Sequence, residues 1–160
     1  MKVEFSKRHR FADWPNSDVP RVAAGVYLIW DGDELIYCGM SGRGLDRIVK
    51  AAGEGKSVEA ASERRRGLTT RLRMHHDGRL SGDQFCVYVA NRLVIPSLKP
   101  SDLPRFHTGE LTLDQLTKEY IHRRLEYQFA VVETEAAAYE LERACCNGVE
   151  LGVKPLLNPR

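Results

Sequence analysis

Two tyrosines and an arginine–histidine pair have the residue types and the spacing from which a chemical site could be built. Tyr27 and Tyr37 lie ten residues apart, each two residues from a glycine, in short apolar segments joined by an acidic turn. Arg71 and His75 lie four residues apart, which places them along one side of a helix. A guanidinium beside a core requires an anionic partner, and an imidazole can take up or release a proton. A helix rotated to send Arg71 into solvent would lift this requirement.

The segment 25–39 predicts two strands and a tight turn, because apolar residues flank Asp31-Gly32-Asp33 and Asp-Gly is a common hairpin turn. The length of the turn decides the register. A three-residue loop places Tyr27 opposite Tyr37, on one face of the hairpin. A two-residue loop pairs Tyr27 with Ile36 and sends Tyr37 to the other face, because a slip of one residue inverts every side chain. The sequence by itself leaves both registers open.

Composition places the chain among ordinary globular domains. It has 160 residues, of which 42% are hydrophobic and 29% charged, and this is enough for one domain with its own core. The net charge is only +2, so a basic surface requires local clustering of arginines. The first residues contain no apolar run, and no stretch of the sequence resembles a signal peptide or a membrane span. We therefore expect no membrane partner.

The cysteines indicate reduced thiols. They are Cys38, Cys86, Cys145 and Cys146. None belongs to a Cys-x-x-Cys pair, which argues against a zinc site, and the two adjacent cysteines cannot easily bridge each other. Free thiols are typical of the cytoplasm, where we expect this protein to reside.

Periodicity and turn residues predict the other elements. The expected helices are 67–78, 111–125 and 133–146, the last with Thr134 as its N-cap. The expected strands outside the hairpin are 84–90 and 127–132. Four prolines and glycines within 91–110 predict a loop with short turns.

These elements predict an α+β fold with a small, mainly antiparallel central sheet flanked by helices. The sheet is expected to have a three-stranded core, with or without one extra strand. Residues 1–160 form a single domain in this interpretation, with an N-terminal arm at 1–22 and insertions at 45–66 and 91–125. The arm is expected to pack on the domain through three aromatic residues, Phe5, Phe11 and Trp14.

The glycine–tyrosine pattern has a family resemblance. Gly25-Val26-Tyr27 and Tyr37-Cys38-Gly39 resemble the paired motif that names the GIY-YIG nuclease superfamily, with valine and cysteine at the isoleucine positions. Members carry an arginine on the helix after the second motif, often a histidine four residues later, then a glutamate on a later helix and an asparagine near the end of the domain. The matching residues, in order, are Arg71, His75, Glu142 and Asn158.

The resemblance spans residues 25–158, and the stretch Ser81-Gly82-Asp83-Gln84-Phe85 resembles stand-alone, single-domain bacterial members. It implies a GIY-YIG-like fold and a shared face for the two tyrosines. The turn should then be odd-numbered, with Tyr27 across from Tyr37 and both hydroxyls directed toward Arg71 and Glu142.

The arginine and the glutamate of the motif each have an alternative position. In compact members the arginine follows the second glycine closely, and Arg47 lies eight residues after Gly39. Arg71 is preferred because it has a histidine one turn later and leucines on either side. Glu140 competes with Glu142, which is preferred because it follows a leucine and precedes an apolar pair.

The resemblance implies an endonuclease that hydrolyses DNA phosphodiester bonds with Mg²⁺ (or Mn²⁺). Glu142 would hold the metal, and Arg71 would bind the scissile phosphate through two N–H groups. Tyr27 would act as general base with His75 relaying the proton, and Tyr37 would hydrogen-bond the water or the phosphate. Asn158 would brace the site from outside.

DNA contacts are expected from basic clusters between the second hairpin strand and the next strand. These residues are Arg43, Arg47, Arg64, Arg65, Arg66, Arg73 and Arg79. Alternatively, the arginine triplet lies on a solvated helix face with Glu59 and Glu63 as partners. The competing function is a catalytically inactive module of the same fold that binds nucleic acid or a protein partner. The DNA substrate, the choice between restriction and repair, and the choice between monomer and homodimer stay open.

Overall fold

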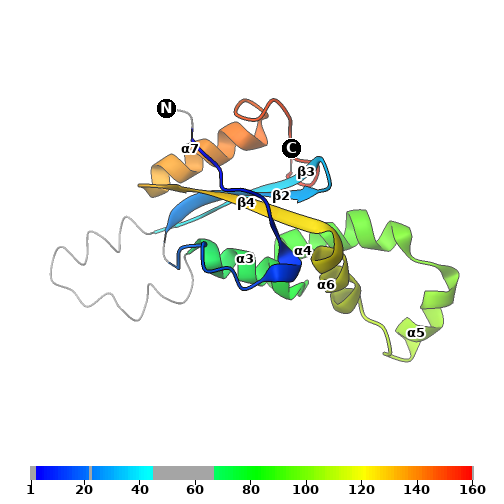
Figure 1. Ribbon diagram of the computed structural model, residues 1–160. Helices are drawn as coiled ribbons and strands as arrows, with labels where there is room; N and C mark the ends of the chain where they lie inside the picture. Colours follow the sequence, from blue (N-terminus) through cyan, green and yellow to red (C-terminus); the bar gives the residue numbers. More distant parts are fainter. Residues whose placement is uncertain (1–2, 22, 45–66, 160) are drawn as a thin grey trace.

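The computed structural model describes residues 3–21, 23–44 and 67–159, and an antiparallel sheet lies at its centre (Figure 1). Within these ranges the sheet has four strands in the order β1-β4-β2-β3. The strands are β1 (His9–Arg10), β2 (Ala24–Asp31), β3 (Glu34–Ser41) and β4 (Leu125–Val132). The predicted α+β class with a small antiparallel sheet is confirmed, and the short β1 is the extra strand.

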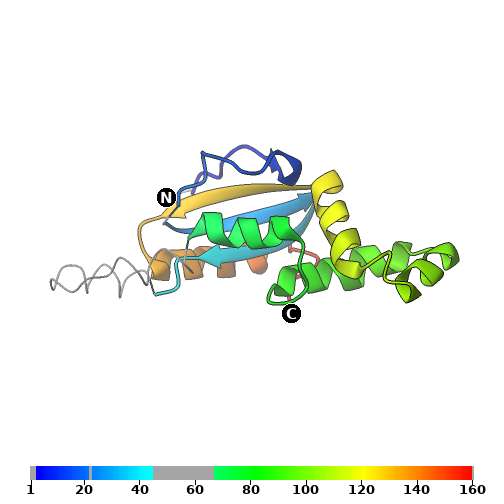
Figure 2. The ribbon, with the colours of Figure 1, turned by 90° about the horizontal axis from the view of Figure 1, so that it is seen from below.

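Helices cover both faces of the sheet (Figure 1). The longer ones are α3 (Leu68–Asp77), α4 (Gln84–Val89), α6 (Leu113–Arg124) and α7 (Glu135–Cys146). α7 packs against β2 and β3 on one face, and α3 lies across the same two strands on the other (Figure 2). Each face therefore buries its own apolar cluster, one around Tyr127 and Phe85 and the other around Leu28 and Leu141. Burying one such large side chain contributes about 1.5–3 kcal/mol.

The two hairpin strands pair with a two-residue turn, so the predicted odd-numbered turn is wrong. Asp31 pairs with Glu34, which leaves Gly32 and Asp33 at the tip, and Gly32 has a φ of +59°. Two-residue hairpin turns require such positive φ values because their twist then matches that of the strands, and glycine adopts them without strain.

A β-bulge nevertheless returns both tyrosines to one face. The pairing shifts between Ile29 and Trp30, so that Ile36 on β3 has no partner of its own. Beyond this extra residue Tyr37 pairs with Ile29, and Tyr27 pairs with Gly39 rather than with Tyr37. The tyrosines are thus diagonal neighbours, with ring centroids 6.4 Å apart. Because a bulge adds one residue to one strand, it cancels the inversion that the two-residue turn would have caused.

The predicted strand at 84–90 is wrong, because these residues form α4. The side chain of Asp83 accepts a hydrogen bond from the Phe85 N–H (3.1 Å) and starts the helix. The buried residues Phe85, Cys86 and Val89 then lie on one helical face. Their apolar, β-branched composition favours a strand, but the cap and the packing of this face override it.

The region predicted as a loop, 91–110, contains successive helical turns. These are η2 (Ala90–Val94), η3 (Ile95–Ser97), η4 (Pro100–Asp102) and α5 (Leu103–His107). Pro96, Pro100 and Pro104 each lie in the first turn of their element, where the missing N–H of proline breaks no hydrogen bond. This part of the chain projects past the end of the sheet (Figures 1 and 2).

The other predicted elements are confirmed. α3, α6, α7 and β4 lie within one or two residues of their expected bounds, and Thr134 accepts from the Ala137 N–H (3.1 Å) as the N-cap of α7. The N-terminal arm also packs as expected. Phe11, within η1 (Phe11–Asp13), is fully buried, and Phe5 and Trp14 pack against the two cores. Across the described ranges, no helix has the length and apolarity to span a bilayer.

The C-terminal segment covers part of the free edge of β3. The N–H of Leu157 donates to the carbonyl of Ile36 (2.8 Å). The Asn158 amide then accepts from the Cys38 N–H and donates to the Cys38 carbonyl, both at 2.8 Å. An uncovered edge strand would expose these groups to pairing with other chains.

The two motif glycines make room for close contacts. A Cβ on Gly39 would overlap the Tyr27 hydroxyl and lie 2.6 Å from the Tyr27 Cζ, so the ring of Tyr27 lies directly over Gly39. A Cβ on Gly25 would overlap the carbonyl oxygen of Ala130 and lie 2.8 Å from Leu68 of α3. Glycine at these positions therefore lets the tyrosine and α3 approach the sheet backbone.

We expect Gly39→Ala to destabilise the fold by about 1–3 kcal/mol, because the new methyl group displaces a buried ring. Urea unfolding measures the loss. In a Tyr27→Leu background the same alanine should cost much less, because the colliding ring is absent. An equal loss in both backgrounds would show that contact with Tyr27 is not the cause.

Candidate active site

A pocket of about 130 Å³ at the edge of β3 brings together five of the six predicted catalytic residues. Its lining includes Tyr27, Tyr37, Arg71, His75 and Glu142. They come from β2, β3, α3 and α7, and the pocket therefore lies where the helices on both faces of the sheet meet at its edge.

Tyr27 and His75 are joined by a buried hydrogen bond. The Tyr27 hydroxyl lies 2.9 Å from the Nε2 of His75, and the Nδ1 of His75 lies 2.6 Å from the Oδ2 of Asp83. An ionised carboxylate can only accept, so the Nδ1 carries a hydrogen, and in a neutral imidazole the Nε2 accepts from the tyrosine. The three side chains form a continuous path for a proton.

Asp83 is the site residue that sequence reasoning did not identify, although it lies in a stretch quoted for the family resemblance. Burial by itself would raise the pKa of this carboxyl, but the hydrogen bond and charge of His75 outweigh burial, with help from Cys86 and the Phe85 N–H. The pKa of Asp83 is therefore held below its usual value. The signal available in the sequence was an aspartate one residue before a potential helix, which is a typical N-cap position.

The two phenols are held in their neutral form. Burial raises the pKa of Tyr27 well above its usual value, Tyr37 adds to this effect, and Arg71 opposes it. Burial also raises the pKa of Tyr37, followed by the charges of Asp83 and Glu142. Neither tyrosine is therefore a base by itself, and Tyr27 can accept a proton only as it passes its own to His75.

Arg71 lies half-buried on α3 and lines the pocket. Within the described ranges it forms no ion pair with a carboxylate. Its charge acts on Tyr27. A half-buried guanidinium that forms no ion pair with the described residues is suited to bind an anion, to which it can donate parallel N–H groups. The rival Arg47 lies outside the described residues.

Glu142, and not Glu140, reaches the pocket from α7. Burial raises the pKa of Glu142, and the charge of Arg43 and a hydrogen bond from the Met40 N–H act in the opposite direction. Glu140 is exposed and lies 3.9 Å from Arg143 on the outer face of the helix. Of the two carboxylates, only Glu142 is placed to act on a group in the pocket.

Asn158 does not line the pocket. Its amide is used fully by the two hydrogen bonds to the backbone of Cys38, on the strand between the tyrosine and glycine of the second motif. It therefore braces the part of β3 that carries Tyr37.

The predicted DNA-binding arginines are divided. Arg43 is exposed and lines the pocket, and Arg73 and Arg79 are exposed on and just after α3. Residues 45–66, which contain the other predicted arginines, lie outside the described residues, and so does the insertion predicted there.

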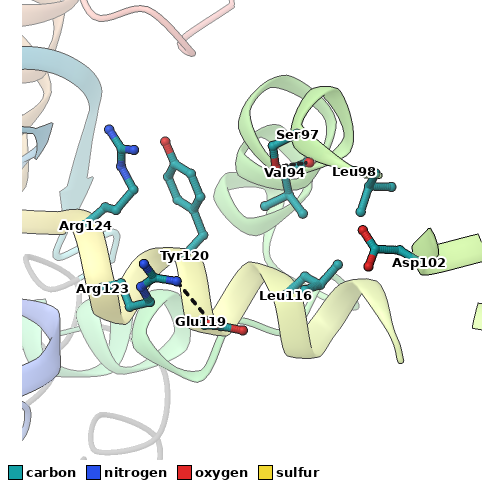
Figure 3. A pocket seen from close by; sticks show the side chains of 9 residues that line it. All are labelled: Val94, Ser97, Leu98, Asp102, Leu116, Glu119, Tyr120, Arg123 and Arg124. Atoms are coloured by element: carbon teal, nitrogen blue, oxygen red, sulfur yellow. Dashed lines mark hydrogen bonds and ion pairs between the residues drawn. The ribbon is translucent and has the colours of Figure 1, made fainter. Parts of the chain in front are cut away.

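Larger hollows occur elsewhere, and some of the charged groups that line them form ion pairs. A pocket of about 300 Å³ lies against α6, where Arg124 lies beside Tyr120 (Figure 3). Arg124 forms an ion pair with Asp31 (3.0 Å), and Arg123 forms one with Glu119 (3.3 Å). A second pocket, of about 490 Å³, follows the N-terminal arm, where Arg8 is paired with Glu126 (3.7 Å). No predicted catalytic residue lines either pocket.

The sequence matches no protein-family model, and comparisons with curated proteins and with solved structures found no match. The resemblance to the GIY-YIG superfamily therefore stays a prediction that rests on the motif residues.

We expect Glu142→Gln to stabilise the protein at pH 7. Because burial raises the pKa of Glu142 above its unfolded value of 4.5, ionising the folded chain carries a penalty that is present at neutral pH and absent well below pH 4.5. Removing the charge should raise the unfolding free energy by less than about 1 kcal/mol, since solvent screens a half-buried group.

Urea unfolding at pH 7 and pH 4 measures this difference, which should shrink at the lower pH. Glu140→Gln is the matched control on the exposed face of the same helix, and it should change stability little at either pH. A stabilisation by Glu142→Gln that persists unchanged at pH 4 would contradict the proposed cause.

Proposed function

We propose that this protein is a DNA endonuclease of the GIY-YIG type that uses Mg²⁺ or Mn²⁺. One observation carries the proposal: five residues predicted from motifs spread over more than 100 positions line one small pocket. They are Tyr27, Tyr37, Arg71, His75 and Glu142. Together they supply a proton path, an anion-binding cation and a carboxylate, which are the groups that phosphodiester hydrolysis requires.

The proton path runs from the pocket to Asp83. As a water molecule attacks phosphorus, its proton passes to the Tyr27 oxygen while the Tyr27 proton passes to the Nε2 of His75. The imidazolium that forms is stabilised by Asp83, 2.6 Å from its other nitrogen. Tyr27 stays neutral throughout, which agrees with the burial that raises its pKa.

Arg71 and Tyr37 would orient the phosphate. The guanidinium can donate two parallel N–H groups to phosphate oxygens and offset the charge that develops on the pentavalent centre. Tyr37, whose raised pKa keeps its proton, can donate to the same phosphate or to the attacking water.

The pocket fits a divalent metal held by a single carboxylate. Glu142 is half-buried and pays a burial penalty for its charge, which a bound cation would relieve. Within the described ranges, no three His, Cys, Asp or Glu side chains converge on one point, so the remaining ligands would be water and phosphate, as Mg²⁺ prefers. When bound, the metal would neutralise the departing oxyanion.

Arg43 is exposed and lines the pocket, and it would contact the DNA backbone together with Arg73 and Arg79, which are exposed on and just after α3. The four cysteines are free thiols, which supports a cytoplasmic location for this activity. The pocket has room for a backbone phosphate, but its size does not indicate which DNA is cut.

The test is cleavage of supercoiled plasmid with Mg²⁺ or Mn²⁺, followed by branched, flapped and single-stranded DNA. We expect cleavage by the natural chain and losses of about 10²-fold or more for Tyr27→Phe and Glu142→Gln. Arg71→Ala should lose turnover but keep DNA binding. Exposed residues of α7 provide controls, because Tyr139→Phe and Glu140→Gln should cleave normally.

A chain that binds DNA but cleaves none of these substrates would favour the inactive binding module instead. Loss of turnover in Arg47→Ala, with normal cleavage by Arg71→Ala, would move the phosphate clamp to Arg47. Normal cleavage by Glu142→Gln together with an inactive Glu140→Gln would move the metal ligand.

Asp83→Asn tests the direction of the proton path. The Phe85 N–H needs an acceptor, so the amide oxygen of an asparagine would face Phe85 and its NH₂ would face His75. The Nδ1 would then have to accept, which moves the imidazole hydrogen to the Nε2 and leaves it unable to accept from Tyr27. We expect turnover to fall by about 10²-fold or more.

The helix cap survives this substitution, so circular dichroism and DNA binding should be unchanged. Asp77→Asn, on the exposed end of α3, is the matched control and should cleave normally. Wild-type turnover in Asp83→Asn would remove Asp83 from the proton path.

A further inference from the structure

Three of the four cysteines gather behind the pocket, on the opposite face of the sheet from Tyr27 and Tyr37. Cys38 lies on β3 between the tyrosine and glycine of the second motif, and Cys145 and Cys146 end α7. Cys38 and Cys145 belong to the same buried cluster, and Cys146 packs against it. The proposed hydrolysis uses none of these thiols.

Helix geometry explains why the thiols meet. Residues 142, 145 and 146 follow one another at intervals that place them on one side of α7, and helical side chains lean toward the N-terminus. The thiols of Cys145 and Cys146 therefore lie over the turn that contains Glu142. The Sγ of Cys38 lies 4.0 Å from the carbonyl oxygen of Glu142, and the Cys145 and Cys146 thiols lie close enough to Cys38 to act on its pKa.

The three thiols differ in their access to solvent. Cys38 and Cys145 have no exposed surface, whereas Cys146 is only partly buried. A small oxidant therefore reaches Cys146 first. The cluster is not arranged as a metal site, because no three His, Cys, Asp or Glu groups in the described ranges could hold one ion.

We propose that Cys146 is a site of oxidation by hydrogen peroxide and that Cys38 completes the reaction as a disulfide. In the first step the Cys146 sulfur takes one peroxide oxygen, which gives a sulfenic acid and releases water. In the second step the Cys38 sulfur attacks the Cys146 sulfur, an S–S bond forms, the S–O bond breaks, and a second water leaves. Peroxide is the two-electron oxidant.

Cys38 is the resolving thiol rather than Cys145. Cys145 is next to Cys146 within the last turn of the helix, and the geometry of a disulfide does not suit neighbouring residues there. Cys38 approaches from a different element, and Cys146 packs against the buried cluster that contains Cys38. The bond would join β3 to α7 directly behind the pocket. It would link the residue after Tyr37 to the residue one helical turn after Glu142. This inference concerns the thiols and does not depend on nuclease activity.

The test is oxidation of the full-length, reduced chain with hydrogen peroxide, followed by blocking of free thiols and non-reducing peptide mapping by mass spectrometry. We expect a Cys38–Cys146 linked peptide that has lost two hydrogens and that a dithiol reductant restores. Cys86, which is fully buried beside Asp83 and has no thiol neighbour, is the internal control and should stay unmodified.

Single variants separate the two roles. In Cys38→Ser the sulfenic or sulfinic acid should accumulate on Cys146 without a cross-link, and in Cys146→Ser the cross-link to Cys38 should be lost. Cys145→Ser should still form the Cys38–Cys146 bond, which keeps the test valid if the Cys38 variant folds poorly. Intact thiols after peroxide, a Cys38–Cys145 or Cys145–Cys146 bond, or equal oxidation of Cys86 would overturn the proposal.

Discussion

The extra residue in β3 is the constraint on which the pocket depends. A two-residue turn by itself would put Tyr27 and Tyr37 on opposite faces of the hairpin, one against α3 and the other against α7. The bulge at Ile36 adds one residue to β3 after the turn and restores the alternation. Both phenols then face α3 and His75, with the Tyr37 and His75 ring centroids 6.1 Å apart. With this two-residue turn and no bulge, the two tyrosines would not both face α3.

The free edge of β3 explains how a residue from the opposite face of the sheet enters the same pocket. Along an edge strand, every second residue directs its backbone groups outward. Here the outward groups are covered in turn, Ile36 by Leu157, Cys38 by Asn158, and Met40 by the carboxylate of Glu142. Glu142 thus reaches around the edge into the pocket, where the Met40 N–H acts to lower its pKa. The glutamate and the asparagine of the predicted motif share one structural task, which is to complete an unpaired strand.

The sequence predicted the parts that local patterns determine. The amphipathic spacing of Leu68, Leu72 and His75 located α3, and Thr134 located the start of α7. The register of the hairpin could not be predicted, because a bulge depends on tertiary packing. Here Trp30 and Leu35, at the bulge, pack in the cluster that includes α7. The helix at 84–89 was missed because its apolar composition is that of a strand, and this composition outweighed the N-cap signal of Asp83. Asp83 was absent from the predicted site because its contact with His75, eight residues earlier, depends on how α3 and the start of α4 pack together.

Asp83 links two processes that are separate in many proteins. One of its oxygens caps α4 and the other holds His75, so the carboxylate satisfies the backbone of one helix and a side chain of another at the same time. Fraying of the first turn of α4 would therefore allow Asp83 to move away from the imidazole, and an imidazole that turns away would remove one of the contacts that hold Asp83 at the cap. Order in α4 and alignment of the histidine are thus coupled through one carboxylate, so that local unfolding of six residues would disturb the arrangement of the pocket.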